Sequence, residues 1–177
     1  MSPDPAKAAT AIAPFSDDPL LGDVAKRDML RLRPPPAADA AAAVGDLLSG
    51  TPLNSGAWAE LAAARRAEGA PIEAVAAALA LSTVTGPNEE YQMARRAAFA
   101  LPLFRALPPD ERRALVADLA GGWYAMDVKD QKRVLDWLDR APDGQGGEVR
   151  DALLRARRGG TLVPGALLPA AAAGSQQ

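Results

Sequence analysis

The sequence predicts an all-α fold in which antiparallel helical hairpins stack into a short solenoid. Segments with the three-to-four-residue periodicity of amphipathic helices recur through most of the 177 residues. No run of alternating β-branched or aromatic residues is present to form strands. Apolar residues make up 49% of the chain but aromatic residues only 5%, and alanine fills most of the difference. This composition is typical of closely packed helices with small side chains.

Two helical segments precede the clearest hairpin. Residues 20–32 form the first, which three consecutive prolines end because proline cannot continue a helix. Residues 37–48 form the second, in which Val44 and Leu47 share an apolar face. A Gly-Thr-Pro sequence then ends this segment.

The clearest hairpin pairs residues 57–67 with residues 71–84. Ser55 is the predicted N-cap of its first helix, and Gly69 stands where a left-handed residue ends such a helix. Pro71 opens the partner helix in its first turn. The predicted inward faces consist of Trp58, Leu61, Ala62, Ile72, Val75, Ala76 and Leu79.

Four more helices are predicted in the second half of the chain, over residues 89–100, 108–122, 128–140 and 148–157. Pro102 should kink or end the first of these. Asp127 is the predicted N-cap of the third. The predicted core residues of this half are Tyr91, Phe99, Leu115, Leu119, Val134, Leu135, Trp137 and Leu138.

Both ends of the chain lack such periodicity. Residues 1–19 are rich in Pro, Ala, Ser and Asp, and residues 159–177 have low complexity, so we predict that both are disordered. Residues 20–158 are then one all-helical domain. The first residues lack the basic and apolar regions of a secretory signal, and no segment is apolar enough to span a membrane. We therefore expect a cytoplasmic protein without membrane insertion.

Composition also excludes several classes of function. Twenty basic and 22 acidic residues give a formal net charge of −2, so no large positive field attracts nucleic acid. Histidine and cysteine are absent, which removes the residues of most acid–base, triad and zinc chemistry. The aspartates of residues 127–139 have no calcium-loop spacing and are interpreted as a solvated helix face. We expect no enzyme activity, no cofactor and no metal.

One stretch carries the pattern of a known repeat family. Trp58, Leu61 and Ala62 match the start of the tetratricopeptide pattern, and Ala74 follows Trp58 at the required spacing. Residues 52–88 therefore resemble one tetratricopeptide repeat (TPR), with degenerate neighbours over residues 37–106. Arg65 and Ala78 stand in slots that the family fills with aromatic residues. The resemblance implies a TPR-like scaffold that binds proteins.

Two further inferences follow from family resemblance. Ligand-clamping members of the TPR family hold a terminal carboxylate through residues of the concave helix, and the corresponding Ala59 and Ala63 imply that this clamp is missing. Residues 86–108 are similar to short repeat-like proteins of GC-rich bacteria that accompany envelope polysaccharide assembly. This similarity implies an adaptor in such a bacterial complex.

The partner-binding hypothesis rests on arginines and small residues. In a stacked repeat, Arg66, Met93, Arg95 and Arg96 would line an alanine-rich groove that accepts a helix or an extended peptide with flanking acidic groups. Trp123 and Tyr124 follow two glycines at a predicted loop, where exposure would allow a binding role, and the alternative is that they pack at the hinge. The alternative function is a helical regulator that contacts nucleic acid through four arginine pairs, against which the balanced charge argues. Nearby acids, Asp118 among them, are expected to pair with the arginines at 65–66 and 112–113.

Overall fold

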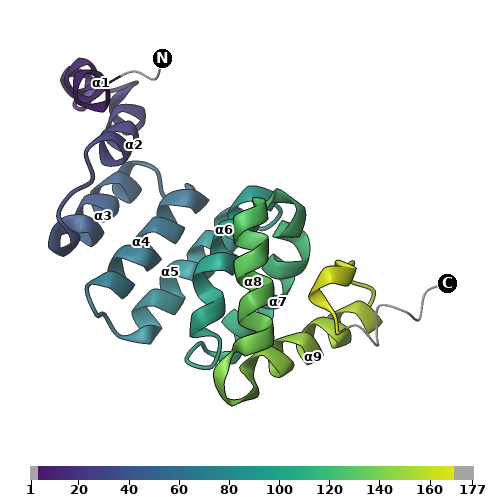
Figure 1. The fold of residues 1–177 in the computed structure, drawn as a ribbon. Coiled ribbons are helices and arrows are strands. Elements are labelled where there is room, and N and C mark those ends of the chain that lie inside the picture. Colours follow the sequence, from purple (N-terminus) through teal and green to yellow (C-terminus); the bar gives the residue numbers. More distant parts are fainter. Residues whose placement is uncertain (1–3, 170–177) are drawn as a thin grey trace. The chain divides into compact units, whose positions relative to one another are not determined.

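The structure, a computed structural model, describes residues 4–169, and this part of the chain contains helices and short 3-10 turns but no strand (Figure 1). The predicted all-α class is therefore confirmed. The α-helices within the described range are α1 (Pro5–Ile12), α2 (Gly22–Leu32), α3 (Ala40–Gly50), α4 (Ser55–Ala67), α5 (Ile72–Thr85), α6 (Glu90–Ala100), α7 (Pro109–Gly122), α8 (Val128–Arg140) and α9 (Gln145–Arg158).

The helices form two compact units instead of the single domain predicted over residues 20–158. Met1–Thr85 is the first unit and holds α1 to α5, while Gly86–Gln177 is the second and holds α6 to α9. The boundary coincides with the Gly-Pro-Asn sequence that follows α5. In both units the helices pack mainly on near neighbours in the chain.

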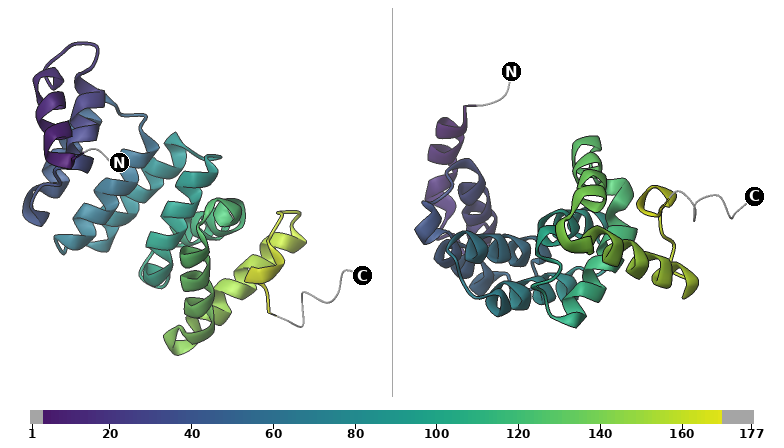
Figure 2. Two further views of the ribbon diagram at one scale, coloured as in Figure 1. Left: turned by 45° about the horizontal axis from the view of Figure 1, so that its top comes forward. Right: turned by 60° about the horizontal axis from the view of Figure 1, so that its bottom comes forward.

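In the first unit each helix packs against the next one along the chain, from α1 through α5 (Figure 2). The closest pair is α4 with α5, the hairpin that the sequence predicts. Asn54, and not the predicted Ser55, caps α4, because its side chain accepts a hydrogen bond from the Ala57 backbone N–H at 3.0 Å. Gly69 has the predicted left-handed conformation, with φ of +75°.

Polar contacts also hold the α4–α5 hairpin. The buried Ser82 hydroxyl donates to the Ser55 carbonyl at 2.7 Å, and the Arg65 guanidinium donates to the Ala74 carbonyl at 2.9 Å. Arg65 thus links the two helices from a position that the TPR pattern fills with an aromatic residue. The buried apolar residues of this unit are Ala9, Ala25, Val44, Leu47, Leu48, Ala57, Leu61, Ala62, Ala64, Val75, Ala76, Ala78 and Leu79.

The N-terminal segment differs from the predicted disorder over residues 1–19. The structure forms α1 there, with the Asp4 carboxylate accepting from the Ala6 N–H at 3.0 Å and Pro5 in the first turn. Ala9 of this helix is only 2% exposed. The alanines that lower the sequence complexity of this segment are also strong helix formers. Residues 1–3 lie outside the described range.

In the second unit α6 and α7 pack closely because glycines remove side chains from their interface. A Cβ at Gly122 would collide with the backbone of Met93 and Ala94 on α6. A Cβ at Gly121 would collide only with the end of the Met93 side chain. Beyond Gly122 the chain continues as the 3-10 turn η4 (Trp123–Ala125), which packs on both helices.

The remaining helices, α8 and α9, pack on each other, and α9 also packs on α7. Asp127 caps α8 as predicted, accepting from the Asp130 N–H at 2.7 Å. Helix α9 begins at Gln145, three residues before the predicted start, and Gly146 packs directly against the Leu138 backbone. Val149 and Leu153 are the fully buried residues of α9.

The described part of the C-terminal segment, up to Pro169, is packed on the second unit. Leu167 and Leu168, at the end of the 3-10 turn η6 (Gly165–Leu167), are 0% and 4% exposed. The Arg150 guanidinium also donates to the Leu167 carbonyl at 3.4 Å. This packing differs from the disorder predicted for residues 159–177, of which residues 170–177 lie outside the described range.

Candidate ligand-binding cavity

The six residues predicted to bind a partner are divided between the two units. Arg66 belongs to α4 in the first unit, whereas the other five lie on α6 and η4 in the second unit. Their burial also differs: Arg66 and Tyr124 are exposed, Met93 and Arg95 are half-buried, and Arg96 and Trp123 are buried.

Arg96 is a structural residue and cannot contact a partner, because it is only 1% exposed. Its Nε donates to one carboxylate oxygen of Asp118 at 2.8 Å, and its Nη2 donates to the other at 2.7 Å. Its Nη1 donates to the Gly86 carbonyl at 3.2 Å. Asp118 therefore pairs with an arginine of another helix, and not with the arginines at 112–113 as the sequence predicts.

The ion pair lies within the α6–α7 hairpin, where both side chains are removed from water. The Asp118 side chain is 6% exposed. Burial raises the pKa of the Asp118 carboxyl above its ordinary value, while the hydrogen bonds and the positive charge of Arg96 act in the opposite direction. The buried carboxylate of Asp118 thus depends on Arg96 for compensation of its charge.

The neighbours of Arg96 on α6 also differ from their predicted roles. The guanidinium of Arg95 lies 6.0 Å from the centre of the Tyr91 ring, a cation–π arrangement. Tyr91 itself is 64% exposed and is not a core residue. Met93 packs at Gly121.

The tryptophans differ in burial. Trp123 is 5% exposed because η4 packs on α6 and α7, which agrees with the predicted packing at the hinge and not with an exposed binding role. Trp58 and Trp137, expected in the core, are half-buried. The Trp58 indole donates to the Pro52 carbonyl at 2.7 Å. Of the predicted aromatic pair at the loop, only Tyr124, which is 80% exposed, can reach a partner.

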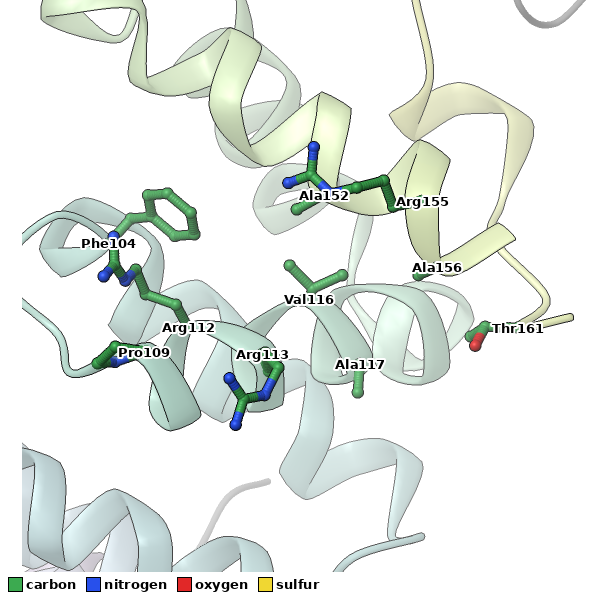
Figure 3. A pocket seen from close by; sticks show the side chains of 10 residues that line it. All are labelled: Phe104, Pro109, Arg112, Arg113, Val116, Ala117, Ala152, Arg155, Ala156 and Thr161. Atoms are coloured by element: carbon green, nitrogen blue, oxygen red, sulfur yellow. The ribbon is translucent and has the colours of Figure 1, made fainter. Parts of the chain in front are cut away.

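A cavity of about 500 Å³ lies between α7 and α9 (Figure 3). Its volume falls within the usual range of ligand pockets, roughly 300–1,000 Å³. Alanine and valine side chains of the two helices form its apolar wall, and three arginines stand around it. The lining residues are Phe104, Pro109, Arg112, Arg113, Val116, Ala117, Ala152, Arg155, Ala156 and Thr161.

The three arginines of the cavity differ in their partners. Arg113 forms an exposed ion pair with Asp110 on the same helix. The guanidinium of Arg112 lies 5.9 Å from the centre of the Phe104 ring. Arg155 makes no ion pair or side-chain hydrogen bond with any other residue of the described range. In Figure 3 the Arg155 side chain extends along α9 above Val116, whereas Arg113 points away from α9.

No acidic side chain is among the residues that line this cavity. It therefore combines an apolar wall with the positive charges of Arg112 and Arg155, for which no ion pair is found among the described residues, an arrangement suited to a ligand that is apolar and carries an acidic group. The sequence predicts Arg112 and Arg113 only as a surface pair, and Arg155 belongs to no motif in it. The spacing of Ala152, Arg155 and Ala156 on one helical face was the available signal.

Two other cavities among the described residues are smaller. One of about 210 Å³ lies by Trp137 on α8, and its charged residues, Asp130 and Arg133, pair with each other at 2.8 Å. Another, in the first unit, is lined by Ile12, Asp28, Arg31 and Leu32.

The carboxylates of α8 face basic residues. Lys132 donates to Asp136 at 2.8 Å, and this hydrogen bond lowers the pKa of the Asp136 carboxyl. Within residues 4–169 no three potential ligand residues lie together as a metal site would require. No helix of this range is both long enough and apolar enough to cross a membrane.

Comparison with known proteins finds no family model, no curated protein and no solved structure that matches this chain.

Proposed function

We propose that this chain is a non-enzymatic protein-interaction module and that its binding site is the cavity between α7 and α9. The observation that carries the proposal is Arg155, whose guanidinium lies beside an apolar wall and has no side-chain partner among residues 4–169. Arginine binds carboxylates through two parallel hydrogen bonds, which gives both affinity and orientation.

The cavity supports a particular kind of partner. Val116, Ala117 and Ala152 leave space for apolar side chains of a helix or an extended peptide, and Arg112 and Arg155 would receive acidic groups beside them. The partner is therefore an apolar segment with flanking aspartate or glutamate. One such segment in one cavity is a small interface, so we expect affinity in about the micromolar range, roughly −8 kcal/mol.

The wider role that we propose is that of an adaptor in a cytoplasmic bacterial complex, such as one for envelope or polysaccharide assembly. The TPR-like pattern around Trp58 and the similarity of residues 86–108 to repeat-like bacterial proteins support this role. The composition, which lacks histidine and cysteine, supports binding without catalysis.

The test is a selection of random peptides displayed on phage, using the whole protein as bait. We expect enrichment of sequences that combine apolar residues with aspartate or glutamate. Arg155→Glu should abolish this enrichment because it places a negative charge where the acidic group binds. Arg158→Glu is the matched control, since Arg158 is an exposed arginine of the same helix that does not line the cavity.

Two outcomes would contradict the proposal. One is an enrichment that Arg155→Glu leaves unchanged, which would place binding elsewhere. The other is retention of duplex DNA by the wild type at about 150 mM salt, where a chain of balanced charge should release it. That result would favour the nucleic-acid alternative.

A further inference from the structure

The first unit exposes a segment whose chemistry complements the α7–α9 cavity. Four large apolar side chains cluster in the connection between α1 and α2 and in the first turn of α2. Their exposed fractions are high: Phe15 47%, Leu20 90%, Leu21 49% and Val24 47%. Such neighbouring exposed apolar residues are typical of interaction sites. We call residues 15–24 the acidic–apolar segment.

Aspartates accompany these apolar side chains. Asp17, Asp18 and Asp23 lie within the acidic–apolar segment, and no lysine or arginine occurs between Lys7 and Lys26. Asp17 is exposed. The segment thus has the composition that the cavity favours, apolar residues with acidic neighbours.

Hydrogen bonds hold a turn at residues 18–21 within the acidic–apolar segment. The Asp18 carboxylate accepts hydrogen bonds from the backbone N–H groups of Leu20 and Leu21, at 2.8 and 2.9 Å. These bonds lower the pKa of the Asp18 carboxyl, so the turn keeps its negative charge. A preformed turn that presents Leu20 outward loses little conformational entropy when it docks.

From this complementarity we infer that the acidic–apolar segment of one copy of the protein docks in the α7–α9 cavity of a second copy. Leu20 and Leu21 would lie against the apolar wall around Val116, and Asp17 would face Arg155. The inference rests on the proposed function, since it names a partner for the same cavity. The contact joins two different surfaces, and such heterologous contacts produce rings or open chains of subunits.

Sedimentation velocity at about 150 mM salt tests the inference, with protein concentrations from low micromolar to several hundred micromolar. We expect the average mass of the wild type to rise with concentration. The double variant Asp17→Arg/Leu20→Arg destroys the segment, and Arg155→Glu destroys the cavity, so each should stay monomeric.

Asp46→Arg/Leu53→Arg is the matched control for the segment, because it changes an exposed aspartate and a 79% exposed leucine elsewhere in the first unit. Arg158→Glu is the control for the cavity, and both controls should associate like the wild type.

Mixing the two monomeric variants tests whether the segment of one chain binds the cavity of another. The Arg155→Glu chain keeps an intact segment, and the Asp17→Arg/Leu20→Arg chain keeps an intact cavity. An equimolar mixture should therefore form a dimer of one chain of each kind. Circular dichroism of each variant verifies that its helicity is unchanged.

A wild type that stays monomeric at every concentration overturns the inference, as does association that either binding-site variant leaves intact. A monomeric wild type whose cavity still selects acidic, apolar peptides overturns only the second-copy inference. If the chain is monomeric and its cavity selects no peptide, the proposed function is contradicted as well.

Discussion

At the scale of single residues, partners distant in the sequence decide what each arginine does. Arg95 and Arg96 are adjacent and chemically identical, yet one lies beside an exposed tyrosine and the other forms a buried ion pair with Asp118. The local pattern of α6 could not separate these roles, because Asp118 is contributed by a different helix. Arg155 illustrates the converse, since its importance comes from the absence of a partner among the described residues.

The buried pair gives the first prediction. Asp118→Asn should lower the free energy of unfolding of the second unit by about 3–5 kcal/mol, because it removes the negative charge that both nitrogens of the buried Arg96 side chain contact. Urea unfolding followed by circular dichroism measures the loss. Asp136→Asn is the control, as its ion pair with Lys132 is exposed and should contribute nothing measurable.

Replacement of both partners distinguishes the contribution of charge burial to stability from that of packing. Arg96→Met combined with Asp118→Leu should cost less than Asp118→Asn alone, since no unpaired charge then remains. A double variant less stable than the single one would mean that the bond from Arg96 to the Gly86 carbonyl matters more than the charge.

At the scale of elements, the sequence predicted eight of the helices in the described range because each has its own stop signals and apolar face. The prolines after α2 and the left-handed Gly69 after α4 are local signals of this kind. Helix α1 was missed because its segment is rich in proline, alanine, serine and aspartate, a composition that is also typical of disordered termini. The cavity was also beyond prediction, since it depends on how α7 packs against α9.

Two adjacent glycines of α7 give the second prediction. Gly122→Ala should destabilise the second unit by about 1–3 kcal/mol, because the new Cβ would meet the α6 backbone, which cannot move aside cheaply. Gly121→Ala should cost less, since its Cβ meets only the flexible end of Met93 and alanine favours the helix. Thermal unfolding of the two variants side by side measures the difference. Equal losses would show that α6 and α7 are not in close backbone contact at Gly122.

At the scale of the whole molecule, the chain divides into two compact units, which the sequence did not predict because Gly and Pro breaks like the one at the boundary also separate helices within a unit. The third prediction is that the units unfold in separate transitions. Asp118→Asn should lower the Tm of one calorimetric transition and leave the other unchanged.

Tryptophan fluorescence assigns those transitions. Trp58 reports on the first unit, and Trp123 and Trp137 report on the second. In a Trp58→Phe variant the fluorescence should follow only the transition that Asp118→Asn shifts. A single transition that moves as a whole would contradict independent unfolding.

The pair of Arg96 and Asp118 has a consequence for the uniqueness of the fold. The interface of α6 and α7 is built mainly from alanine, glycine, leucine and valine, and Gly122 fits closely against the α6 backbone. An alignment in which one helix slides along the other by a turn would lose this fit and would also separate the buried guanidinium from the carboxylate. The ion pair thus adds a second constraint on the register of the hairpin, so an apolar replacement that keeps the hairpin stable should still broaden its NMR resonances through exchange among registers.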